Sequence, residues 1–63
     1  MKNKVKELRK IQKLTQEELA ELIGISRQAI NAIEKEKFDP SLPTAFKMAK
    51  LFDLSIEKIF LFK

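Results

Sequence analysis

The sequence predicts an all-α domain of five helices, and three observations lead to this fold class. Apolar residues recur three and four positions apart along most of the chain, which is the spacing of one helix face. Serine or threonine residues stand just before most of these segments, where helix N-caps belong. Gly24, Pro40 and Pro43 fall between the segments or in a first helical turn. We expect a single domain over residues 1–63, since a chain of this length has room for only one.

The first helix is expected over about residues 4–12. Val5 and Leu8 lie on its apolar side, and Asn3 precedes it as a candidate cap. Ile11 falls near the charged side, and we interpret it as an exposed apolar residue. This helix is expected to support the segment that follows it.

The second helix is expected to begin near Gln16, because Thr15 and Glu18 have the spacing of a capping box. Gly24 can adopt the left-handed conformation that ends it. Its apolar side is formed by Leu19, Ala20, Leu22 and Ile23.

A third helix is expected to begin directly after a short turn. Ile25 can fill the corner of this turn, and Ser26 can cap the helix behind it. Ile30 and Ile33 face inward from the third helix. Two capped helices joined by a short turn that contains glycine have the layout of a helix-turn-helix. The side chains left facing outward are Arg27, Gln28 and Asn31.

These three outward side chains have the chemistry that reads base pairs. Arginine matches the acceptor pair of guanine, glutamine and asparagine match the donor and acceptor of adenine, and all three also bind phosphates. Any surface helix can carry such residues, so the side chains alone do not separate a DNA-binding helix from a structural helical hairpin. Their combination with the small Ala20, the turn at Gly24 and the apolar corner favours DNA binding.

The rest of the chain predicts two more helices. Residues 35–40 form a charged loop that ends before Pro40. Ser41 can cap a fourth helix, which tolerates Pro43 in its first turn. Ser55 can cap a short last helix that contains Ile56 and Ile59. The inner stripe of the fourth helix is formed by Leu42, Ala45, Met48, Ala49 and Phe52.

Composition narrows the classes of function. The net charge of +4 and the pI near 9.6 favour a polyanionic partner, although lysine-rich proteins reach such values without one. The absence of cysteine and histidine argues against a zinc site, and the lack of the usual bases and nucleophiles argues against an enzyme, so we expect no cofactor and no metal. No apolar run approaches the ~20 residues of a membrane span, and residues 1–4 lack the apolar core of a signal peptide. We therefore expect a cytoplasmic protein.

The C-terminal run from Ile59 to Phe62 is apolar without interruption. Its β-branched and aromatic residues suit a short strand, which we expect to pair with Met1–Lys4 of the same subunit as a terminal β-ribbon. A domain this small can scarcely cover the run on both sides. The run either folds back onto the core or forms a subunit interface; we favour the interface and expect a homodimer through the C-terminal segment.

Residues throughout the chain carry a family resemblance, and they are Leu8–Arg9, Leu14–Ala20, Gly24–Asn31, Ile33–Glu34, Pro40–Leu42, Ala45, Ala49 and Ile56–Phe60. With them the whole chain resembles the Cro/C1-type, or xenobiotic-response-element, helix-turn-helix regulators, and most closely their short stand-alone members of the cytolysin-repressor type. The resemblance implies a five-helix, lambda-repressor-like DNA-binding domain that places its third helix in the major groove of double-stranded DNA. We expect a sequence-specific transcriptional regulator, a repressor that acts as a homodimer on a palindromic operator.

The resemblance also implies roles for single residues. It places Gln16 on a phosphate at a helix N-terminus. Arg9 and Glu34 match a paired arginine and glutamate of the family, which implies a structural ion pair between the first and third helices. With the outward side chains, the cap and the loop lysines added, the expected DNA-binding residues are Gln16, Ser26, Arg27, Gln28, Asn31, Lys35 and Lys37.

The chain departs from the family in two places. Lys35–Lys37 replaces a common Asn-Gly-Lys, so either Glu36 adopts a positive φ at a cost of about 1 kcal/mol or more, or the third helix continues past it. Lys13 likewise stands where a turn glycine is common. Two other classes of function stay open: an antitoxin-like protein that holds a protein partner through its tail, and a small enzyme or ligand-sensing domain.

Overall fold

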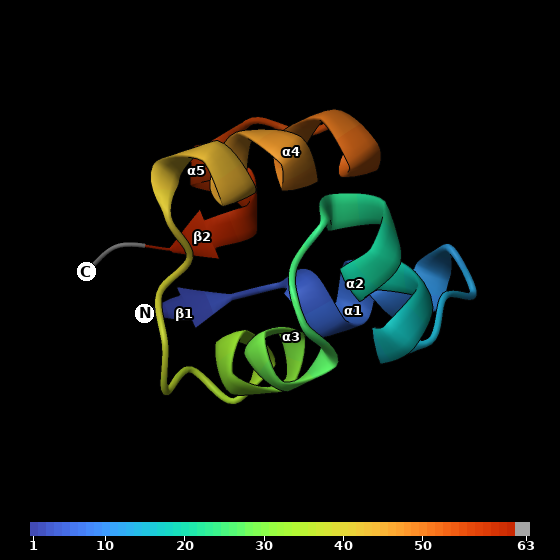
Figure 1. Cartoon of the computed structure of the whole chain (residues 1–63). Helices are drawn as coiled ribbons and strands as arrows, with labels where there is room; N and C mark the ends of the chain where they lie inside the picture. Colours follow the sequence, from blue (N-terminus) through green and yellow to red (C-terminus); the bar gives the residue numbers. More distant parts are fainter. Residues whose placement is uncertain (62–63) are drawn as a thin grey trace.

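The computed structural model describes residues 1–61, which form five helices and a two-stranded ribbon at one side of the molecule (Figure 1). The predicted five-helix fold with a terminal ribbon is confirmed. None of the helices within residues 1–61 has the length and hydropathy needed to cross a bilayer. The elements follow one another as β1 (Lys2–Asn3), α1 (Val5–Ile11), α2 (Gln16–Ile23), α3 (Arg27–Glu34), α4 (Leu42–Phe52), α5 (Ile56–Ile59) and β2 (Phe60–Leu61).

The ribbon brings the two ends of the described chain together. β1 and β2 pair antiparallel, with Lys2 opposite Leu61 and Asn3 opposite Phe60. In Figure 1 the ribbon lies between α3 and the layer formed by α4 and α5. The predicted pairing of the C-terminal run with Met1–Lys4 is therefore correct.

The apolar C-terminal run is covered in part by its own subunit. Ile59 and Phe60 are buried in the core, contrary to the expectation that one domain could scarcely cover this run. Each presents its side chain inward because α5 and β2 fold back against α1 and α4. Leu61 stays 37% exposed. Phe62, the last residue of the run, lies outside the described residues.

The caps of α2 and α3 form as predicted. The Thr15 hydroxyl accepts from the Glu18 amide at 3.0 Å, and the Glu18 carboxylate accepts from the Thr15 amide at 2.8 Å, which completes the capping box. Gly24 ends α2 at a φ of 87°, a conformation that a side chain would strain. The Ser26 hydroxyl accepts from the Ala29 amide at 3.0 Å and so starts α3. These contacts fix the angle between the two helices of the motif.

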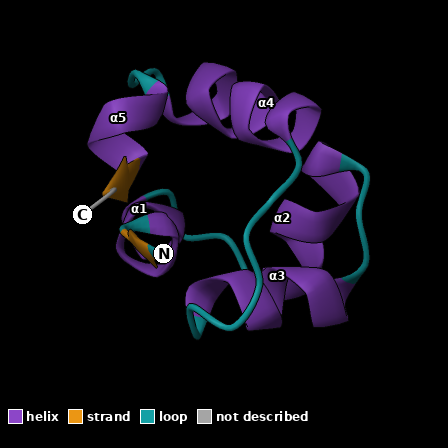
Figure 2. Ribbon diagram, turned by 90° about the vertical axis from the view of Figure 1, so that its left-hand side faces the viewer, coloured by secondary structure: helices purple, strands orange, loops and turns teal. Residues whose placement is uncertain are grey.

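One core holds the helices together, and Figure 2 shows them arranged around it, with α4 and α3 on opposite sides. Every helix and β2 contribute to it. Because α3 buries Ile30 and Ile33 against this core, its other side faces away from the protein. The buried apolar residues are Val5, Leu19, Ala20, Ile23, Ile30, Ile33, Ala45, Met48, Phe52, Ile59 and Phe60.

Three predicted details are wrong. Leu22 is 59% exposed, because the buried side of α2 is centred on the row formed by Leu19 and Ile23. Leu42 is 64% exposed, because it is the first residue of α4 and precedes the turn that meets the core. The Ser55 side chain makes no cap bond; its carbonyl instead accepts from the Lys58 amide at 3.0 Å. Each error lies at a helix edge or end, where spacing is least informative.

Charged residues take the left-handed conformation at three helix ends, and two of these positions, Lys13 and Glu36, stand where the resembled family favours glycine. Lys13, Glu36 and Asp53 have φ values of 60°, 63° and 56°. α3 ends at Glu34 and does not continue past Glu36, which decides between the two alternatives left by the sequence. The amide of Glu36 donates to the Ile33 carbonyl, and the next amide donates to Ala32, both at 3.0 Å. This pair of bonds closes the last turn of the helix and offsets part of the strain at Glu36.

Candidate nucleic-acid interface

The outer face of α3 carries three polar side chains that the fold leaves unengaged. Arg27 and Gln28 are exposed, and Asn31 is half-buried. Within residues 1–61, no hydrogen bond or ion pair occupies these side chains. Their guanidinium and amide groups are therefore available to an external partner, while the buried isoleucines behind them keep the helix in place.

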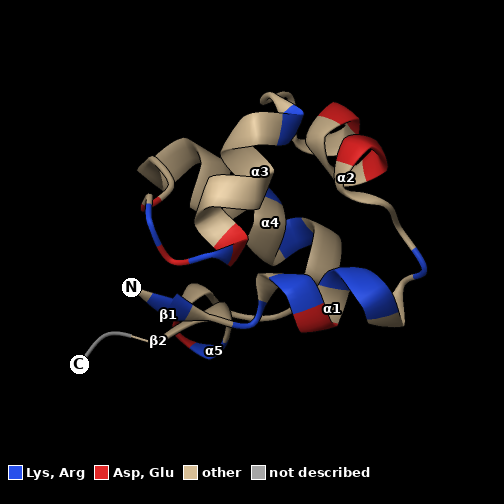
Figure 3. Ribbon diagram, turned by 90° about the horizontal axis from the view of Figure 1, so that it is seen from below, with Lys and Arg blue, Asp and Glu red and all other residues tan. Residues whose placement is uncertain are grey.

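The position of α3 leaves it open to a large partner. It lies along one edge of the molecule, on the side opposite α4 (Figure 1). Figure 3 looks at this edge directly and shows charged residues only at the two ends of the α3 ribbon. The lysine-bearing α1 lies beside it, and the acidic residues of α2 lie at the rim of the view. A polyanion that approaches from this side meets α3 without crossing another helix.

Ser26 combines two roles at the start of α3. Its hydroxyl oxygen accepts the bond from Ala29 that caps the helix. A hydroxyl can also donate, and within residues 1–61 no acceptor takes this proton. Ser26 also stands at the N-terminus of α3, and helix N-termini present their first amide groups to anions. The geometry suits the predicted phosphate contact of Ser26.

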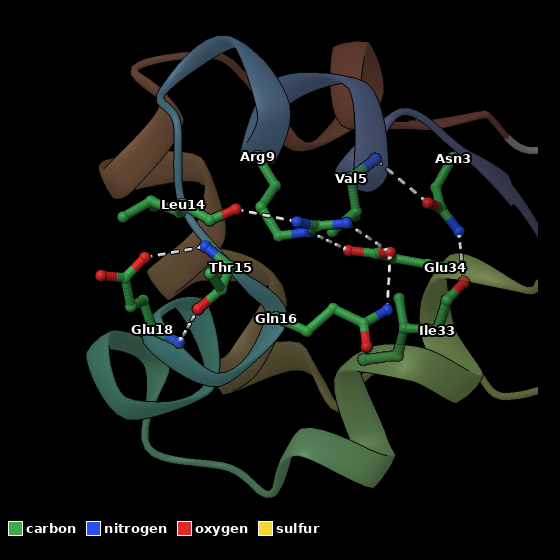
Figure 4. A network of polar contacts seen from close by, with 9 residues as sticks. All are labelled: Asn3, Val5, Arg9, Leu14, Thr15, Gln16, Glu18, Ile33 and Glu34. Atoms are coloured by element: carbon green, nitrogen blue, oxygen red, sulfur yellow. Dashed lines mark hydrogen bonds and ion pairs between the residues drawn. The ribbon is translucent and has the colours of Figure 1, made fainter.

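A buried ion pair holds the far end of α3 (Figure 4). Arg9 donates from Nε to one Glu34 oxygen at 2.7 Å and from Nη2 to the other at 3.3 Å. Only 11% of the Arg9 side chain and 3% of the Glu34 side chain are exposed. Arg9 Nη1 also donates to the Leu14 carbonyl at 2.8 Å. The ion pair that the resemblance implied is confirmed, and it ties α1 to α3.

Gln16 joins this network from the start of α2. Its Nε2 donates to Glu34 at 3.0 Å, so α1 and α2 both bind the same carboxylate of α3 (Figure 4). The amide of glutamine has a second N–H and an oxygen, which this bond leaves available. A phosphate contact by Gln16 stays a prediction, and the bond to Glu34 is a role that the sequence did not predict.

Lys35 and Lys37 flank the left-handed Glu36 just beyond α3. Both side chains are exposed. No acidic group within residues 1–61 pairs with either of them. They stand at the opposite end of α3 from Ser26, so a phosphate contact at each end of the helix stays a consistent prediction.

Comparison with known proteins agrees with this geometry. Residues 5–59 match the family described as helix-turn-helix. An uncharacterized HTH-type transcriptional regulator of Methanocaldococcus jannaschii is 57% identical over the whole of this chain and 96% of its own length. The chain belongs to the helix-turn-helix family of transcriptional regulators.

Two further proteins support this family. The uncharacterized HTH-type transcriptional regulator YgzD of Bacillus subtilis is 48% identical, and the match covers 95% of this chain and 91% of that protein. The crystal structure of the restriction-modification controller protein C.AhdI from Aeromonas hydrophila matches with a TM-score of 0.79 at 32% identity, over 90% of this chain and 86% of that one. The lambda-repressor-like fold and a DNA-binding regulatory role are therefore supported, and the family points away from catalysis.

This helix-turn-helix protein also contains a contact that sequence analysis missed. The expectation that Asn3 caps the first helix is wrong, because Lys4 occupies the N-cap position of α1. Asn3 Oδ1 instead accepts from the Val5 amide at 3.1 Å, and its Nδ2 donates to the Ile33 carbonyl at 2.8 Å. The two residues lie 30 positions apart, and no local pattern signals such a pairing. As for metals, residues 1–61 contain no cluster of three or more side chains suited to hold an ion.

Proposed function

We propose that the protein is a sequence-specific transcriptional repressor that binds a palindromic operator as a homodimer. One observation carries the sequence-specific part of the proposal: Arg27, Gln28 and Asn31 occupy the exposed side of a helix whose other side is buried and whose far end is held by the Arg9–Glu34 pair. A helix held this way presents the bidentate groups of its outer side chains to base edges without having to fold or reorient on binding.

The proposed contacts divide into two kinds. Arg27, Gln28 and Asn31 read bases in the major groove, where an α-helix fits and each base pair offers a distinct pattern of donors and acceptors. Phosphate contacts at the two ends of the motif set the position of the protein on the duplex. The residues proposed for these phosphate contacts are Gln16, Ser26, Lys35 and Lys37.

The proposed subunit contact runs through the ribbon and the surface beside it. Leu61 and Met1 are exposed there, 37% and 41% respectively. A hollow of about 530 Å³ opens next to Leu61, and its apolar lining includes Leu8, Ile11 and Leu54. The ribbon lies at one side of the molecule, and α3 lies along the lower edge (Figure 1). A two-fold axis beside the ribbon would therefore leave both α3 helices on one face of the dimer.

Dimerisation supplies the specificity that one module lacks. A single recognition helix touches only a few base pairs, so useful selectivity needs two half-sites about 34 Å apart. The domain measures 28 by 23 by 20 Å between its outermost Cα atoms, which suits neighbouring copies at that separation. A bound dimer of this size acts as a repressor where its operator overlaps a promoter, and this role places the protein in the cytoplasm with the chromosome.

Selection of bound sequences from random duplexes tests the proposal. Purified protein is expected to enrich one motif with two inverted half-sites whose centres are about one helical turn apart. A matched selection with the triple variant Arg27→Ala, Gln28→Ala, Asn31→Ala controls for binding through phosphates alone. Enrichment of no motif, or of the same motif by the triple variant, would contradict base reading by α3. An unpaired half-site would contradict the homodimer.

A further inference from the structure

We propose that Asn3 is a positioning residue that couples the terminal ribbon to the recognition helix, so that the orientation of α3 on DNA depends on the ribbon. The inference rests on the proposed function, because it makes the ribbon part of the subunit contact. Its basis is a single side chain that joins three elements: β1, which carries it, and α1 and α3, which it bonds.

The bond to α3 falls where the helix most needs support. The carbonyl of Ile33 accepts two donors, the Glu36 amide at 3.0 Å and Asn3 Nδ2 at 2.8 Å. The first of these bonds closes the turn that holds Glu36 at a φ of 63°. Asn3 thus anchors the acceptor that keeps a strained turn closed; Figure 4 shows its bond to Ile33. The same turn carries Lys35 and Lys37, the two lysines proposed to bind phosphates.

The other end of the connection is fixed to the C-terminal segment. The backbone of Asn3 is paired with Phe60, and the next amide, that of Lys4, donates to the Ile59 carbonyl at 2.8 Å. Both C-terminal residues are buried, so they cannot shift without disturbing the core. Any displacement of β2 at a subunit contact therefore moves Asn3, and Asn3 pulls on the last turn of α3.

Asparagine is suited to this task because it offers both a donor and an acceptor. Its Oδ1 serves the Val5 amide, and its Nδ2 serves the Ile33 carbonyl. Aspartate has the same shape and keeps the acceptor but has no donor. Asn3→Asp therefore retains the bond to α1 and removes the two bonds that Nδ2 donates, the one to Ile33 on α3 and a longer, exposed one to the Met1 carbonyl at 3.3 Å. Ser55→Asp is the matched control, since it adds the same charge at an exposed residue whose side chain makes no cap bond.

Two measurements on the full chain test the coupling. The first is the affinity of each variant for the duplex selected above and for a scrambled duplex at one salt concentration. We expect Asn3→Asp to lose about tenfold more affinity than Ser55→Asp on the selected duplex, the equivalent of about one hydrogen bond. On the scrambled duplex, we expect Asn3→Asp and Ser55→Asp to lose equal amounts of affinity, because phosphate binding there does not depend on the exact orientation of α3.

The second measurement is amide hydrogen exchange without DNA. Asn3→Asp is expected to speed exchange at Glu36 and Lys37 about tenfold and to leave the amides of α2 unchanged, whereas Ser55→Asp changes neither. Hydrogen exchange tests the contact between Asn3 and α3 without DNA. If the wild type prefers no duplex, the proposed function fails, but the exchange rates still show whether this contact holds the last turn of α3. Asn3→Ser, whose hydroxyl still reaches Val5 but is too short for Ile33, is the second variant if Asn3→Asp folds poorly.

Three outcomes would overturn the inference. One is unchanged exchange at Glu36 and Lys37 in both Asn3 variants. Another is faster exchange at these amides in the Asn3 variants while their affinity for the selected duplex equals that of Ser55→Asp, which would show that the contact stabilises the fold but does not orient α3 on DNA. The third is an equal extra loss on selected and scrambled duplexes, which would show that Asn3 acts on the whole domain and not on the orientation of α3.

Discussion

Single residues at the ends of helices carry much of the strain in this domain. Four described residues have positive φ, and only one of them, Gly24, is a glycine. The sequence predicted the cost at Glu36 and Lys13 but not which way the chain would resolve it. Local propensity could not decide, because the carbonyl that accepts one of the bonds closing the last turn of α3 also accepts from Asn3, far away in the sequence.

Replacing Glu36 by glycine is expected to stabilise the protein. Glycine adopts a φ of 63° without the steric cost of a β-carbon, and the gain exceeds the entropy that glycine loses on folding. The free energy of unfolding in urea should rise by about 0.5 to 1 kcal/mol. Lys35→Gly is the control, because Lys35 has a φ of −82° and gains nothing from the substitution. A stability decrease in Glu36→Gly would show that the turn is not strained.

Gln28 is the residue through which base reading is best tested. Its side chain is exposed near the start of α3, and Gln28→Ala removes both amide groups without touching the core. The variant is expected to lose about 1 to 3 kcal/mol of binding free energy at the operator and to change the preferred base at one position in each half-site. Competition with single-base variants of the operator measures both. An equal loss of binding free energy on random DNA would show that Gln28 contacts phosphates and does not read bases.

Elements were predicted more securely than their edges. The bounds of α2 and the start of α3 followed from Thr15, Gly24 and Ser26, because caps act within one turn and are determined by the local sequence. The exposure of Leu22 and Leu42 did not follow, since spacing gives the direction of a side chain but not which neighbour covers it. The positions of the candidate base-reading residues on the outer face of α3 were predictable for the same local reason.

The ion pair between α1 and α3 is expected to show strong coupling. Arg9→Met leaves a carboxylate 3% exposed without its cation, and Glu34→Gln leaves the guanidinium without its anion. Each single variant should lose about 3 to 5 kcal/mol of stability, whereas the double variant should lose less than the sum. Urea melts of all four proteins measure the coupling. Additive losses would mean that the two charges do not stabilise each other.

At the scale of the whole molecule, the ribbon connects parts of the chain that are far apart in the sequence. Pairing of the two chain ends was predictable from the β-branched and aromatic composition of the C-terminal run. The burial of Ile59 and Phe60 was not, because it depends on α5 folding back toward α1. The bonds from Asn3 to Ile33 and from Gln16 to Glu34 likewise join residues that only the tertiary fold brings together.

Leu61→Asp is expected to separate the proposed dimer. Burial of a leucine side chain is worth roughly 1.5 to 3 kcal/mol, and two-fold symmetry counts each contact twice. Sedimentation equilibrium at micromolar concentration should give twice the chain mass for the wild type and the chain mass for Leu61→Asp. Phe46→Asp, a change at an exposed apolar residue of α4, should remain a dimer. If the wild type is a monomer, the ribbon only covers the core of its own chain and forms no subunit contact.

The pairing of β1 with β2 also bears on how the protein is made. The first strand leaves the ribosome long before its partner, so β1 has nothing to pair with until residues 60–61 have been synthesised. Helices α2 and α3 make mainly local bonds and can form earlier, but the support from Asn3 waits for the ribbon. The domain is therefore complete only after β2 has been synthesised, and a chain truncated before residue 60 is expected to lack the ribbon.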